Sequence, residues 1–127
     1  MSSARLVHLI DDDGAVRDAV CLLLRVHGYT VQTYPSPHDF LAGGADGGCV
    51  LTDVSMPGMT GLDLLAGLRA SGRDLPVIVM TGRADPHLSD AASEHGALAF
   101  LHKPFAPAEL VASVERALGP TAAPPRA

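Results

Sequence analysis

Short apolar runs alternate with longer segments of helical spacing along nearly the whole chain, and this alternation restricts the fold more than any other feature. The runs occupy residues 6–10, 30–34, 49–52, 76–80 and 97–101. The first, third and fourth runs are almost continuously apolar, which is typical of strands covered on both faces. We therefore predict a parallel sheet with helices packed on both sides.

The segments between the runs carry the start and stop signals of helices. The first helix is predicted to begin after an N-cap at Asp13 and to end at Gly28. Capping-box patterns at residues 36–39 and 60–63, with aspartate as the acid, open the second and third helices. Prolines near residues 86 and 107 mark the starts of the last two.

The resulting order is a strand followed by a helix, five times over. Because five such units cannot close an eight-stranded barrel, we predict an open α/β fold, a doubly wound (βα)5 sheet of the flavodoxin-like class. Ligand sites in such sheets lie at the carboxyl ends of the strands. We expect one domain over residues 1–119 and a Pro/Ala-rich tail or linker stub over residues 120–127.

Composition argues against several classes of partner. The chain has a net charge of −5 and 4% aromatic residues, so neither a nucleic acid nor an anionic membrane is expected to bind this domain directly. Its first apolar run ends at Asp11, which is too soon for a signal peptide or a membrane span. The two cysteines lie far apart in apolar surroundings, so we expect free thiols and a cytoplasmic location.

Acidic residues follow two of the predicted central strands. Asp11 and Asp12 follow the first run and Asp53 follows the third, so the fold brings three carboxylates to one edge of the sheet. A solvated turn with a helix cap is the alternative interpretation of the three adjacent acids Asp11, Asp12 and Asp13. Three clustered carboxylates repel one another, and hard oxygen ligands favour Mg²⁺ as the compensating cation. We therefore expect a Mg²⁺ site.

The six histidines are scattered singly, so none is expected to bind metal, although His102 borders the predicted site. Two other residues follow strands at the same edge, Thr81 after the fourth run and Lys103 after the fifth. Lys103 is the only lysine of the chain. An ordinary surface lysine is the alternative, but its position predicts a cation beside the carboxylates.

The chain resembles the receiver (CheY-like) domain of two-component response regulators, most closely the FixJ-type receivers. The resemblance rests on the acidic pair Asp11 and Asp12, on the block from Asp53 to Gly61 with its Met-Pro-Gly-Met sequence, on Thr81, and on the Lys103-Pro104 pair. These elements span residues 6–118 in the family's order. Each is weak alone, and together they are specific.

The resemblance implies that Asp53 accepts a phosphoryl group from a phosphohistidine, on a sensor histidine kinase or a histidine phosphotransfer protein. Asp11, Asp12, Asp53 and the backbone carbonyl of Ser55 would bind Mg²⁺, and the Lys103-Pro104 bond would be cis. Chemistry supports these roles, since phosphoryl transfer depends on positioning and on neutralising the phosphoryl oxygens. Such a domain is not an enzyme with a separate substrate, although it phosphorylates and dephosphorylates itself at Asp53.

The resemblance also assigns a switch. Lys103 and Thr81 would bind phosphoryl oxygens, and movement of Thr81 would draw Phe100 inward and alter the surface made by the fourth helix, fifth strand and fifth helix. That surface would control a downstream protein or a linked output domain. Ser55 and Arg83 would tune the lifetime of the phosphorylated form. The fourth helix is more polar than in FixJ-type relatives, so we expect little self-association through it.

Two other functions compete with this one. A haloacid-dehalogenase-type phosphohydrolase also uses an aspartate nucleophile at a strand end with Mg²⁺, but it needs an acid two residues later, where this chain has Ser55. A receiver-like interaction module that works without phosphorylation would typically have lost an acid, the threonine or the lysine, and none is lost here.

Overall fold

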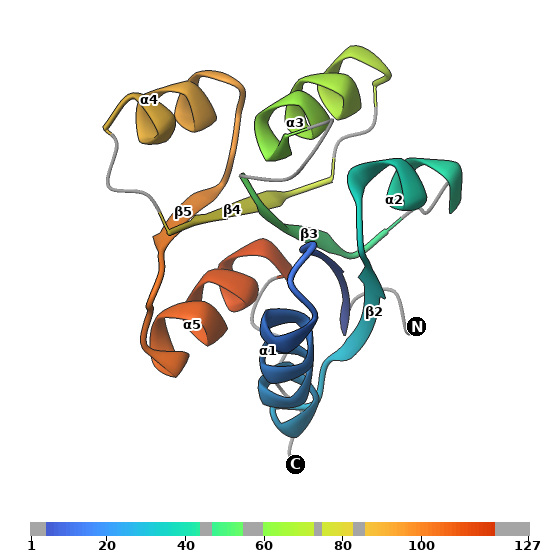
Figure 1. Cartoon of the computed structure of the whole chain (residues 1–127), viewed down its shortest axis with the longest axis vertical. Coiled ribbons are helices and arrows are strands. Elements are labelled where there is room, and N and C mark those ends of the chain that lie inside the picture. Colours follow the sequence, from blue (N-terminus) through green and yellow to red (C-terminus); the bar gives the residue numbers. More distant parts are fainter. Residues whose placement is uncertain (1–4, 44–46, 55–59, 73–74, 83–85, 119–127) are drawn as a thin grey trace.

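A computed structural model describes residues 5–43, 47–54, 60–72, 75–82 and 86–118 of the chain (Figure 1). The strands are β1 (Leu6–Ile10), β2 (Thr30–Tyr34), β3 (Cys49–Asp53), β4 (Val77–Thr81) and β5 (Ala99–His102). The helices are α1 (Gly14–Val26), α2 (Pro37–Gly43), α3 (Gly61–Ala70), α4 (Pro86–Glu94) and α5 (Pro107–Leu118). The predicted order of strands and helices is confirmed.

The five strands form one parallel sheet in the order β2-β1-β3-β4-β5. Strands β3 and β4 are buried along their whole length, and β1 is buried except at Leu6. The edge strands β2 and β5 are partly exposed. The three continuously apolar runs are therefore the three central strands, as their composition predicts.

The sheet separates two apolar layers (Figure 1). Helices α1 and α5 pack on one face, where Leu24 of α1 and Leu110 of α5 are fully buried. Helices α2, α3 and α4 cover the other face, on which Phe40 of α2 and Leu64, Leu65 and Leu68 of α3 are buried. The predicted doubly wound α/β architecture is confirmed.

Local signals explain where the helices begin. The Asp13 side chain accepts hydrogen bonds from the N–H groups of Ala15 and Val16, and thus caps α1 as predicted. Thr60 and Asp63 form the complete predicted capping box of α3. At α2 the Ser36 hydroxyl accepts the Asp39 N–H but donates to the Asp39 carboxylate, so the second half of that predicted box is replaced by a bond between side chains.

The predicted runs differ slightly from the strands at their ends. Asp53 and Thr81 are the last residues of β3 and β4 rather than the first residues after them, and β5 begins at Ala99 instead of residue 97. Among the described residues, none of the helices has the length and apolar character needed to cross a lipid bilayer. The predicted tail, residues 120–127, lies outside the described residues.

Candidate functional site

Three carboxylates meet at the carboxyl edge of the sheet. Strands β1 and β3 are neighbours in a register that pairs Ile10 with Thr52, so the next residues, Asp11 and Asp53, lie side by side. Asp12 comes from the same turn as Asp11, and one carboxylate oxygen of each of the three lies within 4.8 Å of the others. Asp11 and Asp53 are buried, whereas Asp12 is exposed. The predicted cluster is present.

Lys103 reaches this cluster from the segment that directly follows β5. Its backbone N–H donates to the Thr81 carbonyl at 2.7 Å, which fixes the segment just after β5. Its Nζ atom lies 3.1 Å from Asp11 Oδ2 and 3.0 Å from Asp53 Oδ2. The Lys103-Pro104 peptide bond is cis, as the resemblance implies. Lys103 is therefore the bridging cation of the cluster and not a surface lysine.

The environment changes the acidity of two groups in the site. Burial raises the pKa of Asp11, although hydrogen bonds from the Asp13 N–H and from Lys103 oppose the rise. For Lys103, burial lowers the pKa, but hydrogen bonds to Asp53 and Asp11 outweigh it and leave the pKa above its ordinary value. Lys103 therefore stays charged at neutral pH, and its stabilising contribution is lost only as the pH rises through this raised pKa.

Asp11 is held by contacts from three elements. Its N–H donates to the Tyr34 carbonyl of β2 at 3.2 Å, and its Oδ1 accepts from the Asp13 N–H at 2.9 Å. Its carbonyl accepts a hydrogen bond of 2.7 Å from Nη1 of Arg17, on α1. The sequence reasoning missed this arginine, although a basic residue near the start of a helix, where the helix dipole disfavours it, was a usable signal.

The structure explains why the block that follows Asp53 ends in a glycine, Gly61. The Gly61 N–H donates to the Val54 carbonyl at 3.0 Å, so α3 starts directly against the end of β3. A Cβ atom at position 61 would overlap the Asp53 carbonyl oxygen. Only glycine permits this approach of α3 to the backbone of Asp53.

The other predicted site residues are distributed unevenly. Thr81 is buried at the end of β4, whose neighbour β3 ends in Asp53. Phe100 is half-buried on β5 and packs against the layer formed with α2, α3 and α4. His102 is exposed at the end of β5 and is not a member of the carboxylate group. Ser55 and Arg83 lie outside the described residues.

The donor set fits Mg²⁺. It consists of hard carboxylate oxygens close enough to share one ion, with one acid exposed so that water can complete the coordination. Counting full charges, Asp11, Asp12 and Asp53 against Lys103 leave the cluster with an excess of negative charge. Burial is the main cause of the raised pKa of Asp11 and the charge of Asp53 adds to it, so a bound divalent cation would favour the ionised carboxylate.

Replacing both Asp11 and Asp12 by asparagine is expected to abolish Mg²⁺ binding and to stabilise the metal-free protein. The gain follows from removing repulsion, and is expected to be about 1 kcal/mol, or roughly 4 °C in melting temperature. Calorimetric Mg²⁺ titration and melting curves in chelator measure the two effects. The control replaces Asp18 and Asp90, two exposed acids, by asparagine. A less stable Asp11/Asp12 variant would mean that these acids act as structural caps.

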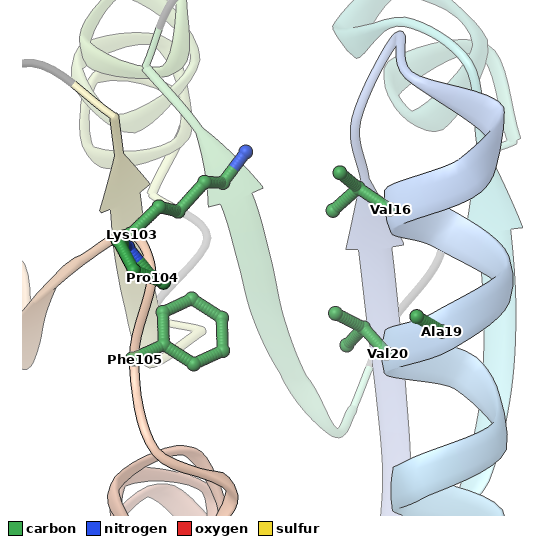
Figure 2. A pocket seen from close by; sticks show the side chains of 6 residues that line it. All are labelled: Val16, Ala19, Val20, Lys103, Pro104 and Phe105. Carbon is green, nitrogen blue, oxygen red and sulfur yellow. The ribbon is translucent and has the colours of Figure 1, made fainter.

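An apolar pocket of about 480 Å³ adjoins the site (Figure 2). Val16, Ala19 and Val20 of α1 form one wall, and Lys103, Pro104 and Phe105 form the other. Figure 2 shows the Phe105 ring facing the two valines, with the Lys103 side chain extending past the pocket. Farther along α1, Leu22 and Val26 are the large apolar side chains that are most exposed among the described residues, at 66% and 73%. Apolar side chains of α1 are thus exposed beyond the pocket as well, alongside the charged Asp18 and Arg25.

Comparisons with known proteins agree with this geometry. The family model described as the response regulator receiver domain matches residues 7–115. The transcriptional regulatory protein FixJ of Azorhizobium caulinodans is 47% identical over 118 residues, which cover 91% of this chain and 56% of that protein. The C4-dicarboxylate transport transcriptional regulatory protein DctD of Rhizobium meliloti is 44% identical over 119 residues, 92% of this chain and 26% of that protein.

Solved structures give the same result. The crystal structure of FixJ-N superposes with a TM-score of 0.85 at 33% identity and covers 93% of this chain and 96% of that one. Chemotaxis protein CheY4 of Vibrio cholerae has a TM-score of 0.80 at 28% identity, with 88% and 97% covered. The chain spans little more than half the length of the FixJ relative and about a quarter of DctD.

Proposed function

Because this chain belongs to the response regulator receiver domain family, we propose that it relays a signal by accepting a phosphoryl group on Asp53 from a phosphohistidine. The observation that carries the proposal is the Lys103 ammonium held between Asp53 and Asp11, within a cluster of three carboxylates. A partly buried cation beside a nucleophilic carboxylate is suited to phosphoryl transfer to that carboxylate. The family match favours this function over a phosphohydrolase.

In the proposed step, an Asp53 carboxylate oxygen attacks phosphorus and a bond from oxygen to phosphorus forms. The bond from the donor's imidazole nitrogen to phosphorus breaks, and its electron pair stays on that nitrogen. Lys103 moves its hydrogen bond from Asp53 to a phosphoryl oxygen, and the Thr81 hydroxyl binds a second one. Asp11, Asp12, Asp53 and, by the family resemblance, the Ser55 carbonyl would hold Mg²⁺, which would supply charge neutralisation for the phosphoryl group.

The output belongs to the same proposal. Thr81 ends β4 next to β5, which carries Phe100, so movement of Thr81 toward the phosphoryl group frees space beside the half-buried ring. The surface of α4, β5 and α5 then changes, which makes Phe100 the two-state element. Ser55 and Arg83 tune the lifetime of the phosphorylated form. A downstream protein or a linked output domain, in the cytoplasm, receives the signal.

The first test is labelling with a small phosphodonor. Acetyl phosphate with Mg²⁺ is expected to add one phosphoryl group to the protein, because the site contains its own catalytic groups. Intact-mass measurement follows the reaction, with chelator in place of Mg²⁺ as the control. Hydroxylamine should remove the label, since it cleaves acyl phosphates. A label that forms without Mg²⁺ or resists hydroxylamine would overturn the proposal.

The phosphohistidine partner is proposed to dock on α1. The pocket between α1 and Phe105 ends at Lys103, so a protein seated there brings its phosphohistidine to Asp53. Leu22 and Val26 continue the apolar surface along the same helix. An amphipathic helix of the partner, laid along α1, would cover these side chains.

A charge in this pocket is expected to impair transfer from the protein donor. Ala19→Arg leaves the core intact, because Ala19 is exposed. It places a guanidinium in the docking surface, which a bound partner would have to desolvate. We expect transfer from a purified, ATP-phosphorylated histidine kinase, chosen by screening with wild type, to fall about tenfold more than labelling by acetyl phosphate. Ala66→Arg, at an exposed position of α3 across the sheet, is the matched control. Equal losses for both donors would place the docking surface elsewhere.

A further inference from the structure

Arg17 occupies a position that the stability of its helix does not explain. It is the fourth residue of α1, near the positive end of the helix dipole, where a cation is unfavourable. Its side chain is half-buried and folds back over the turn that precedes the helix. Nη1 donates to the Asp11 carbonyl six residues earlier, and a Cβ atom at Gly14 would lie 3.5 Å from Nη2. The guanidinium therefore spans the turn that carries Asp11 and Asp12.

Two kinds of contact hold Asp11, namely those made by its carboxylate and those made by its backbone. The bond from Lys103 to Oδ2 is made by a side chain that phosphoryl transfer requires elsewhere. The bonds through the Asp11 backbone, from its N–H to Tyr34 and from Arg17 to its carbonyl, do not involve the carboxylate. These two backbone bonds, one at the Asp11 N–H and one at its carbonyl, hold Asp11 independently of Lys103.

We propose that Arg17 is a positioning residue for the Mg²⁺ site, acting through the backbone of Asp11 without touching the ion. By binding the Asp11 carbonyl it fixes the turn, so that the Asp11 and Asp12 carboxylates converge. It also occupies a backbone oxygen that could otherwise turn toward a cation. Residues that do not touch the metal but hold its ligands in place by hydrogen bonds commonly govern the affinity of a metal site. The inference rests on the proposed function, since it concerns the same cation.

Electrostatics alone predicts the opposite change in Mg²⁺ affinity when Arg17 is replaced, and this difference makes the inference testable. Removing a positive charge near a cation site should tighten Mg²⁺ binding, whereas removing a positioning contact should weaken it. Arg25 provides a matched control on the same helix. Its Nη2 also donates to a backbone carbonyl six residues away, that of Val31, at the end of α1 remote from the carboxylates.

The experiment compares Arg17→Met, Arg17→Lys and Arg25→Met with wild type. Calorimetric titration with MgCl₂ should show a dissociation constant raised about tenfold in Arg17→Met and by less in Arg17→Lys. Arg25→Met should stay within about twofold of wild type. Labelling by acetyl phosphate in Arg17→Met should need more Mg²⁺ for half-saturation while its maximal rate at saturating Mg²⁺ stays within about twofold. Melting curves in chelator establish that each variant is folded.

Unchanged or tighter Mg²⁺ binding in Arg17→Met would overturn the inference and leave the proposed function standing, provided that wild type is labelled. Equal weakening in Arg25→Met would also overturn it, because the effect would then come from α1 as a whole. If Arg17→Met does not fold, Arg17→Lys decides, since it keeps the charge but not the planar donor group. Wild type that neither binds Mg²⁺ nor becomes labelled would overturn both proposals.

Discussion

Asp53→Asn is expected to abolish labelling by acetyl phosphate in the presence of Mg²⁺. An amide oxygen is a far weaker nucleophile than a carboxylate oxygen, and the variant also loses one oxygen of the cation site. Its fold should persist, because the amide oxygen at position 53 can still accept a hydrogen bond from Lys103 and because Lys103 keeps Asp11 as a partner. Intact-mass measurement over time compares the variant with wild type.

The control for this prediction is Asp90→Asn, which makes the same chemical change at an exposed residue of α4. Asp90→Asn should be labelled at the wild-type rate. Labelling of Asp53→Asn to the wild-type extent would show that another residue accepts the phosphoryl group. Peptide mapping of wild-type protein, after reduction of the acyl phosphate, would then identify that residue.

Lys103→Met is expected to change the labelling rate and the Mg²⁺ affinity in opposite directions. Labelling by acetyl phosphate should slow by about 10²–10³-fold, because a preorganised cation for a phosphoryl oxygen is lost. Mg²⁺ should nevertheless bind more tightly, because the 3.0 and 3.1 Å contacts of Lys103 partly neutralise Asp53 and Asp11 in the metal-free protein. Calorimetric titration and intact-mass kinetics measure the two effects on the same sample.

Lys103→Arg is the companion variant for this second prediction. It keeps the charge and so should keep Mg²⁺ affinity near that of wild type, while its planar fork cannot reproduce the compact ammonium. Its labelling should therefore be slow without tighter Mg²⁺ binding. If Lys103→Met is labelled at the normal rate, Lys103 has no part in transfer, and weaker Mg²⁺ binding in that variant would mean that Lys103 mainly shapes the site.

The fold could be predicted from the sequence because its signals are local. Buried strands are recognisable by uninterrupted apolar runs, and the capping residues Asp13 and Thr60 mark helix starts within one turn. The meeting of Asp11 with Asp53 followed from a general property of parallel sheets. The strand order could not be derived this way, since it depends on which strands pair, and the ends of β5 differed from the run for the same reason.

What the sequence did not reveal are individual contacts that form only once the helices and strands pack, some within one turn and some between distant segments. Arg17 reaches the Asp11 carbonyl only because α1 turns back beside β1, and Gly61 is required only because α3 starts against the Asp53 backbone. The buried His8 is another case. Its Nδ1 contacts the Tyr34 hydroxyl and its Nε2 the Gly47 carbonyl, each at 3.1 Å, so a polar ring is satisfied inside an apolar layer. No local pattern predicts such partners.

The separation of the helices into two layers by the sheet has an evolutionary consequence. Helix α1 faces the proposed donor, and α4 lies across the sheet at the proposed output surface, with β3 and β4 between them. Substitutions can therefore accumulate in α4 and recruit a new output while the specificity for the donor is inherited unchanged. Helix α5 shares its layer with α1 and also belongs to the output surface, so selection for either specificity constrains it. Duplicated genes should diverge faster in α4 than in α5.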